Sequence, residues 1–409
     1  MLFRSRAAVP TLREIVCLDG ASQHGPNLTA WLGDTSAAAL KLRLPEDALG
    51  FQGATGGTTG RPKLTQSDNR WVATCTAVWS SCFHFSVPPV NLAVAPITHA
   101  GGFIALSMGQ LGGTTVMMAQ PDVGRMIETI AERQVSLLFL PPTLVYMLLA
   151  HPKLASTDLG SLRYLPVGAA PFAPEKIIEA VHKLGPVICQ GYGQTEAGLP
   201  LTYMSTHDVA DAVADPRKRH RLLSCGQQTN IVEALEIMDE EGRILGSGEQ
   251  GEIVMRGPTE MHGYLDDAAA TAEIKKHGWL HTGDIGRRDE DGYFYITDRK
   301  RDMIISGGFN IFPFEVESAL MEHPSVQDCA VIGVPDEKWG EAVKACVQLK
   351  AGETVNADDL IEHARARVGS MKAPKSIDFV ASLPRSPVGK VLKRELRAPY
   401  WVGRTRQVG

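Results

Sequence analysis

Residues 55–63, Thr55-Gly56-Gly57-Thr58-Thr59-Gly60-Arg61-Pro62-Lys63, are the feature of this sequence that most constrains its fold. Three glycines let the backbone turn its N–H groups toward one point, the threonine hydroxyls add donors, and a lysine stands at the edge. Such a segment is suited to hold a polyphosphate. It is not a Walker loop, because Arg61-Pro62 separates the last glycine from the lysine, and it is not the G-x-G-x-x-G turn. By itself it is equally compatible with a flexible surface loop.

Length and composition indicate several domains and no broad basic surface. With 409 residues, 44% of them hydrophobic, the chain is too long for one compact core, and we expect two or more domains. The formal net charge of -5 argues against a nucleic-acid binder. The seven cysteines form no C-x-x-C pair, which favours reduced thiols over a disulfide or metal framework. No apolar core of signal-peptide length follows Arg4 and Arg6, and no window approaches ~18 uninterrupted apolar residues. We therefore expect a soluble, cytoplasmic protein.

Strand-like and helical patterns alternate through the first half of the chain. One helical stripe follows Ser67 or Asp68, and either residue can cap it. Strands that alternate with helices predict an α/β domain with a mostly parallel sheet covered by helices. Ligands of such sheets bind beyond the carboxyl ends of the strands, where we expect the loops 96–102, 168–171 and 191–196. The predicted strands are 91–97, 114–118, 135–140, 162–167 and 186–189.

The pattern changes twice more along the chain. From 231 to 298, short strands separated by polar turns predict a small antiparallel β module. After Arg299, a helix over 313–321, further strands and a second helix predict a compact α+β domain. We therefore expect an N-terminal domain over 1–298, which includes the β module, and a C-terminal domain over 299–409.

Six further motifs follow the glycine-rich segment. They are Pro96-Ile97-Thr98-His99, Gly191-Tyr192-Gly193-Gln194-Thr195-Glu196, His281-Thr282-Gly283-Asp284, Asp298-Arg299-Lys300-Arg301-Asp302, Ser306-Gly307-Gly308 and Pro384-Arg385-Ser386-Pro387-Val388-Gly389-Lys390. Over residues 45–400 the order and spacing of the seven motifs resemble the adenylate-forming (ANL) superfamily of acyl-CoA synthetases, adenylation domains and luciferases. The resemblance implies an AMP-dependent carboxylate–CoA ligase that uses ATP, Mg²⁺ and CoA.

The implied reaction has two steps. A carboxylate does not react with a thiol in water because oxide is a poor leaving group. Transfer of AMP from ATP, with release of pyrophosphate, makes a mixed anhydride whose leaving group is good, and CoA then takes the acyl group. The task of the protein is positioning and charge neutralisation.

The resemblance assigns the phosphates and the adenine of the nucleotide to two of the motifs and to the turn 168–170. Residues 55–63 would cradle the β- and γ-phosphates, Thr195 would contact the α-phosphate, and Glu196 would hold Mg²⁺ unless it is a surface carboxylate. Tyr192 and the turn 168–170 would enclose adenine. The expected cofactor-binding residues are Thr55, Gly56, Gly57, Thr58, Thr59, Gly60, Lys63, Gly168, Ala169, Ala170, Gly191, Tyr192, Gly193, Gln194, Asp284, Ile296, Arg299, Gly307, Gly308, Trp339 and Lys375, and the catalytic residues are Lys390, Glu196, Thr195 and His99.

Two charged residues are expected at the ribose. Asp284 would accept hydrogen bonds from both ribose hydroxyls, because a carboxylate offers two oxygens to adjacent donors. Arg299 would reach the same sugar. The structural alternatives are a turn-forming aspartate after Gly283, which is compatible with ribose binding, and a surface ion pair for the arginine.

Lys390 matches the lysine that bridges the substrate carboxylate and the α-phosphate in this superfamily and stabilises negative charge on phosphorus. It follows Arg299 by about 90 residues and would reach the site only when a mobile C-terminal domain closes. A hinge near 299–302, where Arg301 replaces the usual Asp or Lys, would exchange it for a CoA channel at 306–308. Without the resemblance, Lys390 is one cation in a basic tail that is typical of a solvated face.

Three further residues have a functional and a structural interpretation. His99 matches a gate between the acid and thiol sites, and is equally compatible with a structural histidine. Trp339 resembles a residue that packs on the CoA nucleotide, and a core tryptophan is the alternative. Lys375 would meet a CoA phosphate.

The implied substrate is a small-molecule carboxylic acid that is hydrophobic, either fatty or aromatic. Amino-acid-activating relatives carry an aspartate near the position of His99, and residues 98–103 contain no carboxylate, which disfavours an amine-bearing acid. The expected pocket residues are small or apolar. They are His99, Gly102, Phe103, Val167, Gly168, Gln190 and Gly198.

Several alternatives stay open at this point. Only 19 residues (391–409) follow Lys390, which favours free CoA over a fused carrier domain. A stand-alone enzyme that loads a separate carrier protein, or a catalytically impaired nucleotide-binding relative, would carry the same motifs. The glycine-rich segment begins at Thr55, much earlier than is usual in the superfamily, so we expect much of the first N-terminal subdomain to be missing, in a natural short form or a fragment. A homodimer is also left open.

Overall fold

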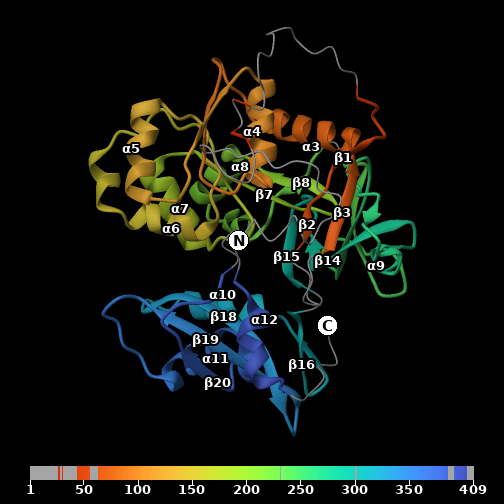
Figure 1. The fold of residues 1–409 in the computed structure, drawn as a ribbon. Helices are drawn as coiled ribbons and strands as arrows, with labels where there is room; N and C mark the ends of the chain where they lie inside the picture. Colours follow the sequence, from red (N-terminus) through yellow and green to blue (C-terminus); the bar gives the residue numbers. More distant parts are fainter. Residues whose placement is uncertain are drawn as a thin grey trace. The chain divides into compact units, whose positions relative to one another are not determined.

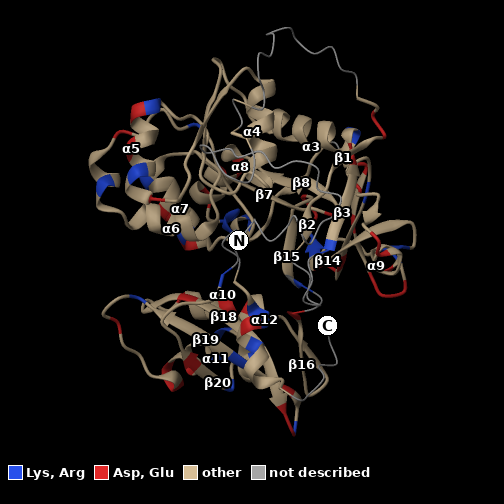
Figure 2. Cartoon of the chain, viewed as in Figure 1, with Lys and Arg blue, Asp and Glu red and all other residues tan. Residues whose placement is uncertain are grey.

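A computed structural model describes residues 26–27, 30, 44–55, 63–230, 232–299, 302–385 and 391–402 (Figure 1). Contacts divide the chain into a unit of residues 1–45 and a unit of residues 46–409, and the second contains every motif. In the described part of the chain, no helix combines the length and the apolar composition that crossing a membrane requires. Figure 2 shows lysine and arginine interspersed with aspartate and glutamate over the helices and strands.

The first part of the larger unit has the predicted alternation of strands and helices. Its strands β4 and β5 pair in parallel, as do β6 and β7, and single parallel bridges at Leu137 and Leu140 join the two pairs. The elements are α3 (Asn69–Cys82), β4 (Val90–Ala93), α4 (Ala100–Gln110), β5 (Thr114–Met117), α5 (Val123–Arg133), α6 (Pro142–Ala150), β6 (Leu165–Val167), α7 (Pro174–Leu184), β7 (Ile188–Gln194), β8 (Gly198–Met204), α8 (Thr206–Ala214) and β9 (Gln227–Gln228).

Helix α3 shows why the sequence folds this way locally. Asp68 is its N-cap, and the Asp68 Oδ1 accepts a hydrogen bond from the Trp71 N–H at 2.7 Å, which confirms one of the two predicted caps. The apolar stripe at Trp71, Cys75 and Trp79 is buried in a cluster with α4. A second cluster fills the space between the parallel strands and helices α5 to α8.

Two predictions of secondary structure, one strand and one loop, were inaccurate. Residues 135–140 form isolated bridges and no continuous strand, although Leu138 and Leu140 are fully buried as the apolar run predicted. Residues 191–194 were expected in a loop, but they extend strand β7. The reason is an antiparallel partner, β8, which pairs Gly191 with Tyr203 and Tyr192 with Thr202. Glycine-rich composition alone gave no sign of this partner.

The antiparallel β module is confirmed over the described residues. Its sheet has the order β10-β11-β14-β13, with β15 also paired to β14, and every pairing is antiparallel. A neighbouring sheet has β3 between β1 and β12, and β2 also pairs with β3. The elements are β1 (Leu49–Phe51), β2 (Ala54–Thr55), β3 (Lys63–Asp68), β10 (Ala234–Met238), β11 (Gln250–Arg256), β12 (Gly263–Tyr264), α9 (Ala268–Ile274), β13 (Lys275–Lys276), β14 (Trp279–Arg288) and β15 (Phe294–Arg299).

The last part of the chain has a core of its own. Its sheet has the order β17-β16-β19-β18, and β20 joins β19 in parallel. Helices α10 and α11 cover an apolar cluster that includes Ile304, Val331 and Leu360. A domain boundary near residue 299 stays a prediction. The elements are β16 (Ile304–Ser306), β17 (Phe309–Ile311), α10 (Pro313–Met321), β18 (Val326–Asp336), β19 (Gly340–Leu349), α11 (Ala357–Lys372), β20 (Ser376–Phe379) and α12 (Lys393–Arg397).

Candidate functional site

The predicted phosphate-binding segment is carried by a β-hairpin. Residues Gly56, Gly57, Thr58, Thr59 and Gly60 lie outside the described residues, but both ends of the segment are described. Thr55 ends β2 and Lys63 begins β3, and the two are direct partners in the antiparallel pairing. Because a strand, and no helix, follows Lys63, the structure agrees with the exclusion of a Walker loop.

The base of this hairpin lies against the motif that contains Thr195. The Thr65 N–H donates to the Gly53 carbonyl at 2.9 Å. A Cβ added at Gly53 would lie 2.4 Å from Thr195 Cγ2, so the hairpin base and the threonine are in direct contact. The structure therefore brings together two of the motifs that were predicted to contact phosphate.

Glu196 is held at one carboxylate oxygen and at its backbone. The Tyr264 hydroxyl donates to Glu196 Oε1 at 2.9 Å, and the Met261 N–H donates to the Glu196 carbonyl at 2.9 Å. Among the described residues, no side chain or backbone N–H donates to Oε2, and no group of three or more His, Cys, Asp or Glu gathers in a metal-binding cluster. Magnesium is commonly held by one or two carboxylates together with substrate phosphates and water, so a single carboxylate with a free oxygen fits this ion.

Asp284 is the centre of a buried polar cluster in the predicted site. Its side chain is 3% exposed. The Tyr192 hydroxyl donates to Asp284 Oδ2 at 2.7 Å, and Arg299 Nε lies 3.0 Å from Asp284 Oδ1. Burial and the nearby carboxylate raise the pKa of Tyr192 well above its usual value, so the phenol stays a donor. The same carboxylate raises the pKa of Arg299. Each Asp284 oxygen keeps lone pairs for further donors.

The local fold explains this geometry. Asp284 and Arg299 are direct partners in the antiparallel pairing of β14 with β15, so one side chain faces the other. Gly283 has φ +71°, a conformation that favours glycine, and its N–H donates to Glu252 Oε1 at 2.9 Å. The Thr282 hydroxyl donates to the Ile253 carbonyl at 2.7 Å and accepts from the Asp284 N–H at 3.1 Å.

Sequence reasoning missed two residues of this region. Glu252 accepts the Gly283 N–H and lies 3.1 Å from the His281 Nδ1, so it supports the turn before Asp284. Tyr264 supports Glu196. Neither residue belongs to one of the seven motifs, and their contacts depend on strand pairings across long sequence separations, so the sequence carried no signal for them.

The residues predicted at adenine are neighbours. In the parallel pairing of β6 with β7, Val167 lies opposite Gln190, and a Cβ added at Gly168 would be 3.1 Å from the Gly191 carbonyl oxygen. Ala169 has φ +71° and is exposed, as is Ala170. Gln194 extends from the same strand, and its side-chain amide donates to the Thr282 carbonyl at 3.2 Å. Ile296 is half-buried on β15, opposite Gly286.

The predicted acid-binding residues are divided between a surface turn and the core. His99 is exposed at the start of α4, and its Nδ1 lies 2.9 Å from the Thr98 hydroxyl. Phe103 is 6% exposed and packs edge-on against Phe51 and Trp71. Val167, Gln190 and Gly198 are also buried. Two surface cavities, of about 420 and 260 Å³, are lined by other residues.

Gly102 supports the turn that carries His99. We expect Gly102→Ala to lower the free energy of unfolding by about 1–3 kcal/mol, because its Cβ would lie 1.9 Å from the Ile97 carbonyl oxygen. Denaturant unfolding would measure this change. The matched control is Gly109→Ala in the same helix, which meets nothing within 4 Å and should stabilise the protein by about 0.5–1 kcal/mol. Equal changes in the free energy of unfolding for the two variants would contradict the close contact of Gly102 with the Ile97 carbonyl.

The residues predicted at CoA are partly brought together. The Gly307 N–H donates to the Trp339 carbonyl at 2.8 Å, and a Cβ at Gly307 would lie 2.6 Å from Trp339 Cε3. Gly308 follows at φ +81°. Trp339 is 38% exposed, which argues against the core alternative. Lys375 is also exposed, and its ammonium donates to the Ser370 carbonyl at 2.7 Å.

Lys390 lies outside the described residues. Arg385 and Val391 stand on either side of residues 386–390, both are described, and they pair with each other. Arg385 and Val391 form an antiparallel bridge, and the Leu392 N–H donates to the Pro384 carbonyl at 2.8 Å. The segment that contains Lys390 therefore starts and ends at neighbouring positions.

Comparisons with known proteins agree with the motifs. Residues 6–265 match the AMP-binding enzyme family and residues 315–390 match the AMP-binding enzyme C-terminal domain. The chain is 37% identical to the medium/long-chain-fatty-acid–CoA ligase FadD8 of Mycobacterium tuberculosis, over 92% of this chain and 67% of that protein. It is 37% identical to a feruloyl-CoA synthase of an Amycolatopsis species, over 94% of this chain and 73% of that protein.

Among solved structures, the amide bond synthetase McbA from Marinactinospora thermotolerans superimposes with a TM-score of 0.86 at 31% identity, covering 98% of this chain and 78% of that one. Seven motifs, the α/β architecture and these matches lead to one conclusion, which confirms the resemblance seen in the sequence. The chain belongs to the AMP-binding enzyme family of adenylate-forming proteins.

Proposed function

We propose that the chain is an AMP-forming acid–thiol ligase that activates a hydrophobic carboxylic acid with ATP and transfers the acyl group to CoA. The observation that carries the proposal is the buried carboxylate of Asp284, which lies between the Tyr192 hydroxyl and the Arg299 guanidinium. Burying an ion pair carries a desolvation penalty, and ionisable groups with perturbed pKa values gather at functional sites. Because the chain belongs to the AMP-binding enzyme family, we infer that this carboxylate binds the ribose of the nucleotide.

Five described regions and Lys390, which lies outside the described residues, divide the work of adenylation between them. Asp284 and Arg299 hold the ribose, the 168–170 turn and Tyr192 border the adenine, and Thr195 contacts the α-phosphate. Magnesium, held by Glu196 and the phosphates, supplies charge neutralisation when bound. The carboxylate of the acid attacks the α-phosphorus, pyrophosphate leaves, and the Lys390 ammonium stabilises the added negative charge.

The second step uses the C-terminal residues. The CoA thiol attacks the acyl carbonyl, the acyl–oxygen bond breaks, and AMP leaves. Gly307 and Gly308 let the pantetheine approach closely, Trp339 packs on the CoA nucleotide, and Lys375 meets a phosphate. A C-terminal domain that begins near Arg299 turns about a hinge at 299–302 to exchange the lysine for this channel. The exposure of Trp339 beside Gly307 supports this assignment.

The acid is hydrophobic. Both relatives compared above are named for hydrophobic acids, a medium- or long-chain fatty acid and ferulate. The absence of a carboxylate in residues 98–103 supports an acid without an amine. The described cysteines are free thiols, which fits a reducing compartment and supports a cytoplasmic location.

A panel of acids tests the proposal. We expect pyrophosphate release with a medium-chain fatty acid or a cinnamic-type aromatic acid, little release with succinate or alanine, and an acyl-CoA product by mass spectrometry when CoA is added. Because McbA is named for amide bonds, a second arm replaces CoA by a primary amine, and a third replaces it by a phosphopantetheinyl carrier. Product only with the amine or the carrier would refute the CoA acceptor, and no release with any acid would refute the ligase.

A further inference from the structure

Tyr264 touches two of the predicted phosphate-site residues at once. It lies in β12, where it pairs with Thr65 of β3, two residues after Lys63. Its hydroxyl donates to Glu196 Oε1 at 2.9 Å. On its ring face, the Lys63 ammonium lies 5.0 Å from the ring centroid, within the range of a cation–π interaction. One side chain thus contacts both a predicted metal-binding carboxylate and the lysine that ends the glycine-rich segment.

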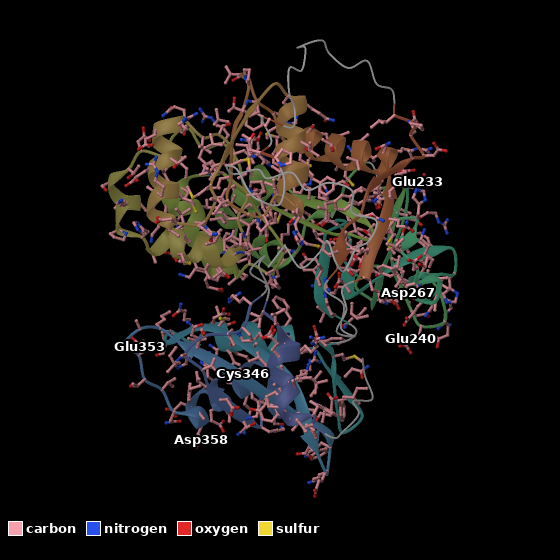
Figure 3. The ribbon with its side chains drawn as sticks, in the orientation of Figure 1. Glu233, Glu240, Asp267, Cys346, Glu353 and Asp358 are labelled. Carbon is pink, nitrogen blue, oxygen red and sulfur yellow. The ribbon has the colours of Figure 1, made fainter. Side chains whose placement is uncertain are left out.

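Lys63 has a second neighbour that limits its movement. Asp267 Oδ2 lies 3.8 Å from the ammonium, at the start of α9 (Figure 3). Asp267 is itself fixed, because its Oδ1 caps the helix by accepting the Ala270 N–H at 2.9 Å. The lysine ammonium therefore has an aromatic face and a carboxylate as neighbours, and its side chain is 30% exposed.

We propose that Tyr264 is a positioning residue that fixes the Glu196 carboxylate and the Lys63 ammonium relative to each other for the binding of Mg²⁺ with ATP. This proposal rests on the proposed function of the site. The phenol occupies Oε1 and thereby turns Oε2 outward for a cation. The ring face attracts the ammonium of Lys63, which follows the residues that would hold the phosphates. Two groups of opposite charge are then presented at a fixed separation before any nucleotide arrives, which lowers the ordering cost of binding.

A purely structural role is the competing explanation. The Tyr264 ring packs at the edge of the apolar cluster of the β module, and its N–H donates to the Thr271 hydroxyl at 2.9 Å. A structural role predicts that variants lose thermal stability and that ATP affinity falls equally with and without magnesium. Our proposal predicts that the magnesium-dependent part of ATP affinity changes.

The test is isothermal titration calorimetry of ATP binding, in excess Mg²⁺ and in EDTA. Tyr264→Phe keeps the ring and removes only the hydroxyl. We expect it to weaken ATP binding about tenfold in Mg²⁺, because Glu196 loses its charge-assisted hydrogen bond, and to leave binding in EDTA unchanged. Tyr264→Leu also removes the face under Lys63 and should weaken binding in both conditions. Wild-type magnesium dependence in Tyr264→Phe would overturn the proposal, as would an equal loss in both conditions.

A matched control and a double-mutant cycle exclude the structural explanation. Tyr295 in the same β module also donates its hydroxyl to a carboxylate, Asp289 Oδ2, at 2.8 Å, and Tyr295→Phe should leave the magnesium dependence intact. In the cycle, Glu196→Gln should remove the magnesium dependence. Adding Tyr264→Phe should then cause no further loss, because the tyrosine acts through that carboxylate. Additive losses would contradict the proposal.

Failure of this proposal and failure of the proposed function give different results. The titrations need no carboxylic acid and no turnover. If no acid supports pyrophosphate release and Tyr264→Phe still changes the magnesium dependence, the ligase function fails and the positioning role stands. If pyrophosphate release occurs and the variant binds as the wild type does, the positioning role fails alone.

Discussion

Asp284→Asn is expected to lower kcat/KM for ATP by about 10²–10³-fold, equivalent to about 2.7–4 kcal/mol, mainly through a higher KM for ATP. The substitution keeps the shape of the side chain and removes its charge and one acceptor oxygen. The ribose hydroxyls then lose a charged acceptor, and Arg299, 3.0 Å away, loses its counter-charge. Steady-state kinetics at saturating acid and CoA measures the effect. The KM for the acid should change little.

A control from the same β module separates this effect from a general loss of charge. Asp291 pairs with Arg221 at 2.6 Å, and its side chain is 60% exposed, so Asp291→Asn should change stability by at most about 1 kcal/mol and leave the kinetics unchanged. Thermal melting of both variants shows how much of the Asp284 effect is structural. An unchanged KM for ATP in Asp284→Asn would mean that the carboxylate serves the fold and does not hold the sugar.

Lys390→Ala is expected to lower the rate of adenylation by about 10²–10³-fold, because the added negative charge on phosphorus loses its cation. The second step should be much less affected, since the resemblance places the lysine away from the site when CoA reacts. Carboxylate-dependent pyrophosphate release measures the first step. Conversion of supplied acyl-AMP and CoA into thioester measures the second.

The control for this variant is three residues away. Lys393 Nζ lies 2.8 Å from Glu317 Oε1, and both side chains are largely buried, so Lys393→Met should lower stability and slow the two steps alike. A large loss in both steps for Lys390→Ala, with melting like that of the wild type, would contradict a lysine that acts only in adenylation.

The motifs predicted which regions of the chain lie close together. The strand pairings of the structure determine which side chains are in contact. Helix α3 and its cap at Asp68 followed from local patterns, since a cap and a stripe are set within a few residues. Asp284 and Arg299, which the resemblance placed at one sugar, are partners in the pairing of β14 with β15, and their roles at the ribose stay a prediction. The bond from Tyr192 to Asp284 joins residues 92 apart, and no local pattern indicates it.

The remaining errors and omissions have a common physical cause. Residues 191–194 were predicted in a loop because the motif follows the end of a predicted parallel strand, and the pairing with β8 makes them a strand. Tyr264, whose hydroxyl donates to Glu196, lies in β12, and this strand pairs with β3, about two hundred residues earlier in the chain. Long-range strand pairing depends on packing of the whole domain, which the spacing of motifs does not encode.

The central claim is that this chain makes an acyl-adenylate, and exchange of labelled pyrophosphate into ATP tests it most directly. The account predicts exchange that depends on a hydrophobic carboxylic acid, needs no CoA, and falls sharply in Asp284→Asn and Lys390→Ala. Exchange that is absent with every acid, or ATP cleavage that yields ADP and phosphate in place of AMP and pyrophosphate, would contradict it.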